Sequence, residues 1–181
     1  MFGYNGCTGN FDLYYHLAGK DITLSCLHLD EKKNLWMGTT SNGLYCLSGD
    51  KKISQPVTRG NIASIYEDSS KELWICTWEE GLYRIKTDST IENFRHDPKN
   101  PNSICADFVR SCCEDNAGNL WIGTFHGLNR YEKSTGKFQL YTANANKPDG
   151  LAHSSSWCIV KDEQGTIWLG TYFGGVNYFN P

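Results

Sequence analysis

No stretch of this sequence has apolar residues at the three- and four-residue spacing of a long amphipathic helix, and no apolar run is long enough to span a membrane. The net charge is only −3, with lysine and arginine scattered along the chain, so it lacks the basic patch of a nucleic-acid-binding protein. Residues 1–6 have neither the basic start nor the apolar core of a signal peptide. The composition is that of an ordinary globular protein. The length of 181 residues suits one domain.

The chain contains four copies of one short sequence motif. Each copy has an aspartate and, six residues later, a tryptophan. The aspartates are Asp30, Asp68, Asp115 and Asp162, and the tryptophans are Trp36, Trp74, Trp121 and Trp168. Successive tryptophans are 38, 47 and 47 residues apart. A period near this length with a recurring tryptophan and glycine is typical of β-propellers, so the repeat predicts an all-β fold.

The third copy shows what one repeat predicts. Residues 108–114 form a run of strand length, and the turn 115–119 contains Asp, Asn and Gly, which favour tight reversals of the chain. Further strands are expected at 120–124, 128–131 and 138–141, separated by the short turns 125–127 and 132–136. Each repeat is therefore predicted to be one blade, a four-stranded antiparallel meander. The tryptophan is expected to fill the gap between adjacent blades.

The whole chain, 1–181, is then a single partial propeller domain. The expected blades are 21–57, 60–96, 105–143 and 154–181. The last blade has three strands, and residues 11–15 resemble the missing fourth. Because an open blade exposes unpaired backbone, we expect the strand 11–15 to complete this split blade. The pairing would occur within one chain, as a four-bladed ring, or between two chains, as an eight-bladed dimer.

Eight cysteines are present, but no two have CxxC spacing and Cys112 directly precedes Cys113, so we expect neither a zinc site nor another metal or cofactor. Cys26 and Cys158 stand where the sister repeats carry serine, which indicates a requirement for a small residue. We expect mostly reduced, buried thiols.

The motif D-x-x-G-x-[LI]-W-[IL]-G-T-x-x-G-[GL] resembles the two-component regulator propeller repeat. Residues 114–131 and 161–179 carry the resemblance almost letter for letter, and it extends over nearly all of the chain from residue 21. The first copy departs most, because Glu31-Lys32-Lys33 stands where glycine is usual.

In that family such repeats fill the extracellular sensor regions of hybrid two-component systems, above all in gut Bacteroidetes. There they form arrays, commonly of two rings with about seven blades each. They precede an immunoglobulin-like domain, a transmembrane helix, a histidine kinase, a receiver and a DNA-binding domain. The resemblance implies that this chain is a fragment of a periplasmic sensor, attached to the membrane only through other parts of its parent protein. Its expected ligand is a glycan-derived oligosaccharide.

Recognition is expected on the face where the turns between second and third strands converge. These turns carry aromatic rings beside a carboxylate and an imidazole, a combination that suits sugars. The candidate ligand-binding residues are Trp78, Glu79, Phe125, His126, Tyr172 and Phe173. The alternative is that these aromatic rings only cover the ends of the blades. A second candidate is the polar loop 142–156, with Asn144, Asn146, Lys147, Asp149 and His153.

Two other functions remain open. Some propellers of similar repeat are lyases, but a second strand of the W-F-T-E type is absent, and the five histidines are scattered among different blade positions. Only His126 with Glu79 or Glu80 would form an acid–base pair, so we predict no catalytic residues and no enzymatic activity. The other alternative function is that of a propeller that binds other proteins.

Overall fold

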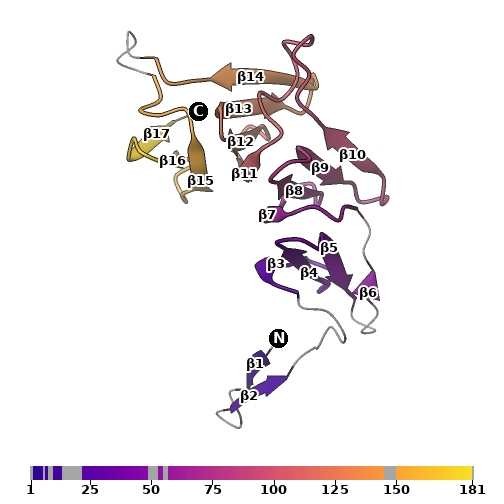
Figure 1. The fold of residues 1–181 in the computed structure, drawn as a ribbon. Helices are drawn as coiled ribbons and strands as arrows, with labels where there is room; N and C mark the ends of the chain where they lie inside the picture. The colour runs from indigo at the N-terminus through magenta and orange to yellow at the C-terminus, as the bar shows by residue number, and fades with distance from the viewer. Residues whose placement is uncertain are drawn as a thin grey trace.

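The computed structural model describes residues 2–5, 7, 10–13, 22–48, 53–54, 57–144 and 150–180. All strands in these ranges pair antiparallel, and the described residues contain no helix. Four sheets follow one another along an arc, with the first strand of each sheet on the inner side (Figure 1). The predicted all-β propeller architecture is therefore confirmed. Nothing among the described residues is a helix long and apolar enough to cross a membrane.

The first sheet contains β3 (Leu24–Leu29), β4 (Leu35–Thr39), β5 (Leu44–Leu47) and β6 (Ile53–Ser54). The second contains β7 (Ile62–Glu67), β8 (Leu73–Thr77), β9 (Leu82–Ile85) and β10 (Ile91–Phe94). The third contains β11 (Val109–Glu114), β12 (Leu120–Thr124), β13 (Gly127–Glu132) and β14 (Lys137–Tyr141). The fourth contains β15 (Ser156–Lys161), β16 (Ile167–Thr171) and β17 (Val176–Phe179).

The N-terminal strand differs from the prediction. β2 (Asn10–Leu13) pairs with β1 (Phe2–Asn5), a strand that the repeat pattern did not indicate, in a separate two-stranded sheet. Within this chain β2 therefore does not complete the last blade. Pairing with a neighbour in sequence closes a short loop, whereas pairing with β17 would close almost the entire chain, at a larger entropic cost. The expected residues 14 and 15 lie outside the described residues.

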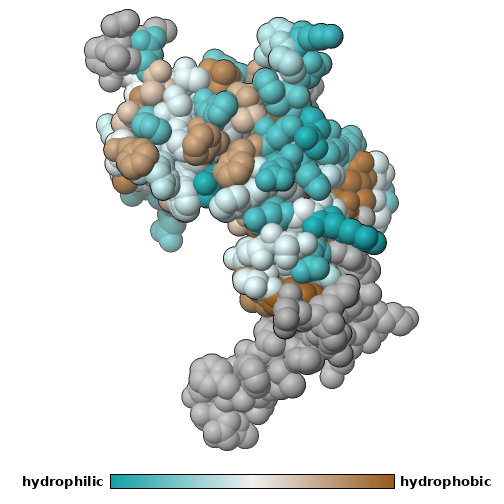
Figure 2. Space-filling view, in the orientation of Figure 1, coloured by the Kyte–Doolittle hydropathy of each residue, from teal (hydrophilic) through white to brown (hydrophobic). Residues whose placement is uncertain are grey.

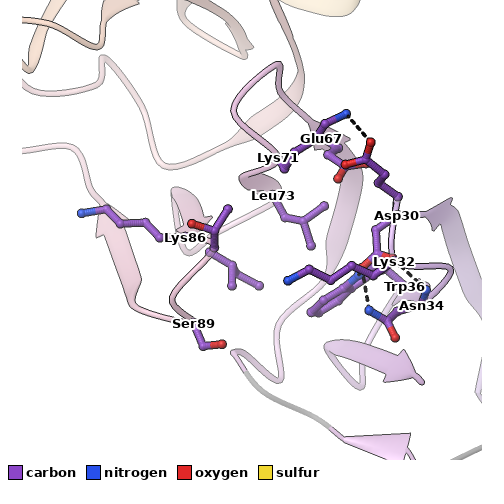
Figure 3. A pocket seen from close by; sticks show the side chains of 12 residues that line it. Asp30, Lys32, Asn34, Trp36, Glu67, Lys71, Leu73, Lys86 and Ser89 are labelled. Carbon is purple, nitrogen blue, oxygen red and sulfur yellow. Dashed lines mark hydrogen bonds and ion pairs between the residues drawn. The ribbon is translucent and has the colours of Figure 1, made fainter. Parts of the chain in front are cut away.

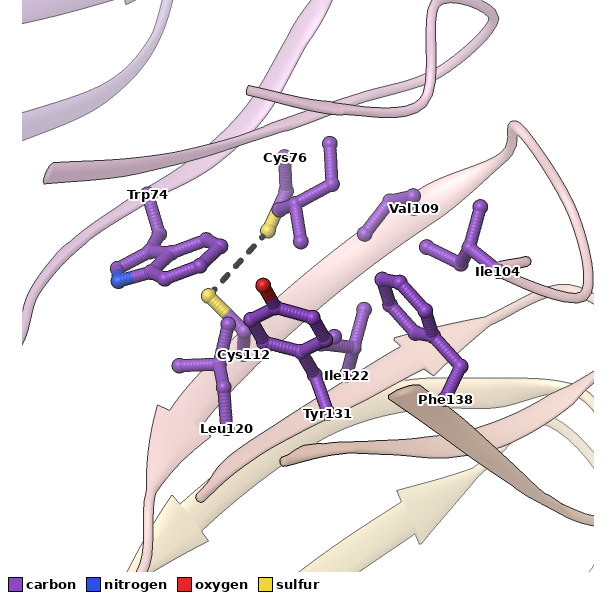
Figure 4. Packing of buried hydrophobic residues seen from close by; sticks show 10 residues of the cluster. Trp74, Cys76, Ile104, Val109, Cys112, Leu120, Ile122, Tyr131 and Phe138 are labelled. Atoms are coloured by element: carbon purple, nitrogen blue, oxygen red, sulfur yellow. Dashed lines mark hydrogen bonds between the residues drawn. The ribbon is translucent and has the colours of Figure 1, made fainter. Parts of the chain in front are cut away.

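The blades pack through their inner strands and through the recurring tryptophan. β3 contacts β7, β7 contacts β11, and β11 contacts β15, so these four strands surround the centre of the arc. Trp74 is fully buried between the second and third blades, against Leu120 and Tyr131 (Figure 4). Trp121 is buried in the same way against Ile167 of the fourth blade. The role expected of the tryptophan is thus observed at both interfaces.

The constant spacing of aspartate and tryptophan has a hydrogen-bonding cause. In every blade the indole Nε1–H donates to Oδ2 of the aspartate six residues earlier, at 2.8–2.9 Å. The other carboxylate oxygen accepts the backbone N–H four residues after the aspartate, as in the bond from Asn119 to Asp115 at 2.8 Å. The aspartate is thus a turn former, as predicted, and it also fixes the orientation of the interface tryptophan.

Lys133 ties the second blade to the third. Its ammonium group donates to Asp68 at 2.6 Å and to Glu114 at 2.5 Å, and both carboxylates are nearly inaccessible to solvent. Burial alone would raise the pKa of Asp68, but hydrogen bonds from Lys133 and Trp74 outweigh it and lower that pKa below its ordinary value. This ion triad holds the blades in register at the end of the propeller that carries the aspartate turns.

All eight cysteines are free thiols. Cys46, Cys76, Cys112 and Cys113 are buried, whereas Cys7 and Cys158 are exposed. Cys76 replaces the glycine of the other copies, and its Sγ lies 3.6 Å from Sγ of Cys112 in the next blade. At the corresponding position in the first blade, a Cβ on Gly38 would clash with Cys26 in the same blade and would come within 2.7 Å of Ile62 in the next. Two inner strands, that of the same blade and that of the next, therefore limit the size of the residue at this position.

Candidate functional site

A β-bulge recurs at the start of every inner strand. In the third blade Val109 pairs with Thr124 and Ser111 with Gly123, which leaves Arg110 without a partner in the ladder. The same shift occurs in the other three blades. The four bulge residues are Ser25, Ala63, Arg110 and Trp157. A bulge redirects its side chain, and here all four side chains line one cavity at the centre of the arc.

The turn between the second and third strands is built alike in each blade. A threonine at the end of the second strand donates its hydroxyl to a glycine carbonyl across the turn, as Thr77 does to Gly81 at 2.7 Å. The next residue donates its backbone N–H to the residue ahead of the inner strand, as Trp78 does to Asn61 at 3.1 Å. The positions equivalent to Trp78 are Thr40, Phe125 and Tyr172. This arrangement places one turn residue per blade beside the bulge residues.

Aromatic rings from three blades meet around Arg110. The guanidinium carbon lies 3.8 Å from the ring centroid of Trp157, 4.5 Å from that of Trp78 and 4.8 Å from that of Phe108. Trp78 belongs to the preceding blade and Trp157 to the following one, so Arg110 joins the two by cation–π contacts.

Ring contacts extend the group on both sides of Arg110. Phe108 lies 5.7 Å from Phe125, and Trp157 lies 5.3 Å from Tyr172. Tyr172 in turn contacts Phe173 at 4.4 Å. We call the group the aromatic–arginine cluster, and its members are Trp78, Phe108, Arg110, Phe125, Trp157, Tyr172 and Phe173. Hydrophobic side chains gather on the surface over β11 and the last sheet (Figure 2).

A cavity of about 340 Å³ opens beside this cluster. Its apolar walls include the two tryptophan rings, and its polar groups come from Ser25, Thr40 and Asn61. Among the described residues of the lining, Arg110 is the only charged one. The volume lies at the lower end of the range of roughly 300–1,000 Å³ for small-molecule sites. Aromatic walls with a few polar groups are the composition of a site that binds a small polar molecule with apolar faces.

The residues predicted from sequence fall into two groups. Trp78, Phe125, Tyr172 and Phe173 lie together in the aromatic–arginine cluster. The two remaining candidates are peripheral. His126 is exposed, and its ring contacts only that of Phe125, at 5.6 Å, among the rings of the described residues. Glu79 is exposed and forms no hydrogen bond or ion pair with another described side chain. Whether any of the six binds a ligand stays a prediction.

The acid–base pair considered for a lyase does not form. In the described part of the chain, no hydrogen bond or ion pair joins His126 to Glu79 or Glu80. Glu80 instead accepts hydrogen bonds from Thr58 and from Tyr83, the latter at 3.0 Å, and so supports the turn. Within the described ranges no group of three or more histidine, cysteine or acidic side chains is placed to hold a metal ion.

The second loop candidate, 142–156, is described only in part. Residues 145–149 lie outside the described residues, among them Asn146, Lys147 and Asp149. His153 accepts a hydrogen bond from the backbone N–H of Ser155 at 3.0 Å, and its ring lies 5.8 Å from that of Phe173. The end of this loop therefore borders the aromatic–arginine cluster.

Another cavity, of about 180 Å³, lies between the first two blades at the end with the aspartate turns (Figure 3). Charged residues of both signs line it, and some are already paired: Lys71 with Glu31 at 3.4 Å, and Asn34 with Asp30 at 2.9 Å. Asp30 and Trp36 here form the aspartate–tryptophan bond of the scaffold. This cavity is the weaker candidate because its lining groups serve the turns.

Sequence reasoning missed Phe108, Arg110 and Trp157. Arg110 and Trp157 hold the position directly before the small residue of the inner strand, where the other copies have Ser25 and Ala63. Side-chain alternation alone does not show which way such a residue points, because the bulge breaks the alternation. The position directly before the small residue differs in all four copies, but so do other positions of the inner strand, so the sequence did not single it out.

The fold and the repeated turns define the chain as part of a β-propeller. Two of its four repeats, at residues 103–126 and 150–173, match the family model of the two component regulator propeller. The chain thus contains repeats of that family. No curated protein sequence matches the chain.

Solved structures share the fold at low sequence identity. Virginiamycin B lyase from Staphylococcus aureus is 18% identical, with a TM-score of 0.65, and the match covers 92% of this chain and 58% of the lyase. The WD40 propeller domain of Doa1 is 12% identical, with a TM-score of 0.67, over 91% of this chain and 53% of that one.

A third match is the extracellular domain of a protein assigned as a hybrid two component system from B. thetaiotaomicron. It is 24% identical, with a TM-score of 0.44, over 92% of this chain and 27% of that one. The chain spans less than two thirds of each of these three structures. The likenesses to the lyase and to Doa1 show the propeller fold.

Proposed function

We propose that this chain is the ligand-sensing portion of an extracytoplasmic sensor of the hybrid two-component type. In this proposal the cavity beside the aromatic–arginine cluster takes a glycan-derived oligosaccharide, and the signal passes to a kinase outside the chain. The family repeats at 103–126 and 150–173 support the sensor class. The proposed location is the periplasm, and the proposed role of the chain is binding without catalysis.

The observation that carries the proposal is the convergence of aromatic rings on one cavity. Trp78 and Trp157 both line it, and Tyr172 extends the aromatic surface outward. Sugar rings present apolar C–H faces that stack on aromatic side chains, while their hydroxyls form directional hydrogen bonds. In the described part of the chain the side chains of Thr40 and Asn61 form no hydrogen bond, so both are free to bind sugar hydroxyls.

Calorimetric titration of the purified chain with a panel of oligosaccharides tests this proposal. We expect at least one member of the panel to bind, and Tyr172→Ala to weaken binding tenfold or more, about 1.4 kcal/mol. Trp78→Ala should act in the same direction. Leu140→Ala, which removes an exposed side chain of the outermost strand β14, is the matched control and should bind as the unaltered chain does. The proposal fails if no oligosaccharide binds.

Signalling follows from binding if the ligand prefers one arrangement of the sensor over another, because a ligand shifts an equilibrium only by its difference in affinity for the two states. The cavity is lined by residues from all four blades, so its occupant touches each inner strand. A change in the angle between blades would therefore alter the contacts of the bound ligand.

We also propose that the chain associates with a second copy of itself. Trp168, Val176, Tyr178 and Phe179 are exposed on the last sheet, whereas the equivalent Trp74 and Trp121 are covered by the next blade. β17 has no fourth strand beside it among the described strands, so its edge carries unpaired backbone groups. A strand of the partner copy would satisfy the edge, and a sheet of the partner packed on the last blade would cover the apolar face.

A further inference from the structure

Arg110 is a half-buried cation that the scaffold leaves without a hydrogen-bonded or charged partner. Its Nε is inaccessible to solvent and has no hydrogen-bond partner in the protein. None of the hydrogen bonds or ion pairs of the described residues involves its guanidinium group. An unpaired buried donor costs free energy, and the cost is larger for a charged group.

The other stacked arginine shows what the scaffold does elsewhere. Arg84 lies over Trp74, with its guanidinium carbon 5.2 Å from the ring centroid. It also donates to Glu72 at 2.7 Å and to Glu92 at 3.2 Å. Its carboxylate partners raise the pKa of Arg84 against the opposite effect of burial. For Arg110, burial lowers the pKa and no carboxylate opposes it.

The position of Arg110 makes it available to a ligand. It lies at the bulge of β11, and no other charged residue of the described ranges lines the 340 Å³ cavity. The neighbouring rings of Trp78 and Trp157 hold the guanidinium by cation–π contacts. No hydrogen bond among the described residues uses its N–H groups, so these remain for a ligand. A planar guanidinium binds carboxylate, sulfate or phosphate oxygens in a bidentate manner.

The small bulge residues of the first two blades supply the space for such a group. Ser25 and Ala63 occupy the positions that Arg110 and Trp157 fill in the other blades, and all four line the cavity. The cavity therefore has a cationic, aromatic side and a side with small residues. Its polar groups on the latter side are neutral, so no fixed negative charge in the lining competes for Arg110.

We propose that Arg110 recognises an acidic group of the ligand, so that the cavity takes a sugar unit bearing a carboxylate or a sulfate ester. This inference rests on the proposed oligosaccharide-sensing function of the same cavity and specifies the ligand class. The aromatic rings bind the apolar face of the sugar, and Arg110 binds its anionic substituent.

Matched pairs of probes test the charge requirement. Digalacturonate is titrated against its dimethyl ester, and galactose 6-sulfate against galactose, with the intact chain in each case. We expect an acidic member to bind at least tenfold more tightly than its neutral counterpart. Preference for digalacturonate identifies a carboxylate ligand, and preference for galactose 6-sulfate identifies a sulfate ester. Equal binding within both pairs overturns the inference.

Variants then assign the effect to Arg110. Arg110→Gln should abolish the preference for the acidic probe while neutral sugars bind as before. Arg110→Lys, which keeps the charge but loses the planar fork, should retain only part of it. Arg130→Gln on β13 changes the net charge equally, and Arg130 does not line the cavity, so this control should bind like the unaltered chain. An unchanged preference in Arg110→Gln contradicts the inference.

An inorganic anion separates this inference from the proposed function. Sodium sulfate, compared with sodium chloride at equal ionic strength, should change the fluorescence of the tryptophans beside Arg110, and Arg110→Gln should lose that change. A sulfate response without binding of any sugar supports the anion site and refutes the glycan sensor. Neutral oligosaccharides that bind equally well to Arg110→Gln, with no sulfate response, support the sensor and refute the anion site.

Discussion

The four tryptophans of the repeat differ in what surrounds them, although each makes the same hydrogen bond to its aspartate. Trp121 is 1% exposed and packs against the fourth blade, whereas Trp168 is 39% exposed and no other blade of the described residues covers it. The indole bond to aspartate is 2.8 Å long in both cases. Comparing the two residues therefore separates the contribution of burial to stability from that of the hydrogen bond.

Replacing Trp121 with alanine should lower the free energy of unfolding by about 3–5 kcal/mol, because it opens a cavity between two blades. Trp168→Ala should cost at most about half of that, since less apolar surface is lost and the cavity is open to water. Chemical denaturation monitored by circular dichroism measures both. Equal losses in the two variants would show that the hydrogen bond, and not interface packing, determines the effect.

The aspartate turn is the element that links stability to pH. Burial alone would raise the pKa of Asp115, but hydrogen bonds from Trp121 and Asn119 outweigh it and lower that pKa below its ordinary value of 3.8. The pKa values of Asp30 and Asp68 are lowered by hydrogen bonds of the same kind. A carboxylate with a lowered folded-state pKa stabilises the fold fully above its unfolded pKa and loses this effect as the pH falls through the folded value.

We therefore expect the free energy of unfolding to be constant near neutral pH and to fall on acidification from about pH 5 to about pH 3. Asp115→Asn should be less stable at neutral pH and should show a shallower decline in acid, because one titrating group is gone. Glu163→Gln, at an exposed turn position, is the control and should follow the unaltered chain. Stability that rises on acidification would contradict this account.

The strands could be predicted from sequence because turn chemistry and side-chain alternation agree within each copy. The predicted strand 120–124 coincides with β12, and that at 138–141 differs from β14 by one residue. β1 was not predicted, because it precedes the first copy and belongs to no repeat. Repeat comparison thus reveals what the copies share and gives no information outside them.

The candidate site was only half predictable for a related reason. The turn residues Trp78, Phe125 and Tyr172 follow the constant threonine, so their common location can be deduced from the repeat. Arg110 and Trp157 sit at a bulge, which depends on strand pairing that a single sequence does not display. Their approach to one another across blades appears only in three dimensions.

At the level of the whole molecule, the exposed last sheet predicts self-association. Light scattering at micromolar concentration should give the mass of a dimer for the unaltered chain. Tyr178→Lys should shift it to a monomer, because Tyr178 is 69% exposed on β17 and a charge there opposes burial. Leu140→Lys on β14 should leave the mass unchanged. A monomer at every concentration would refute association through this sheet.

The recurring bulge also bears on how such propellers diversify. Serine, alanine, arginine and tryptophan occupy the same bulge position in four sheets of one chain, so the surrounding strand pairing tolerates very different side chains. Mutation at positions 25, 63, 110 and 157 is thereby uncoupled from the selection that preserves the blades. New ligand preferences can evolve, or be engineered, by changing four codons in a frame that keeps its shape.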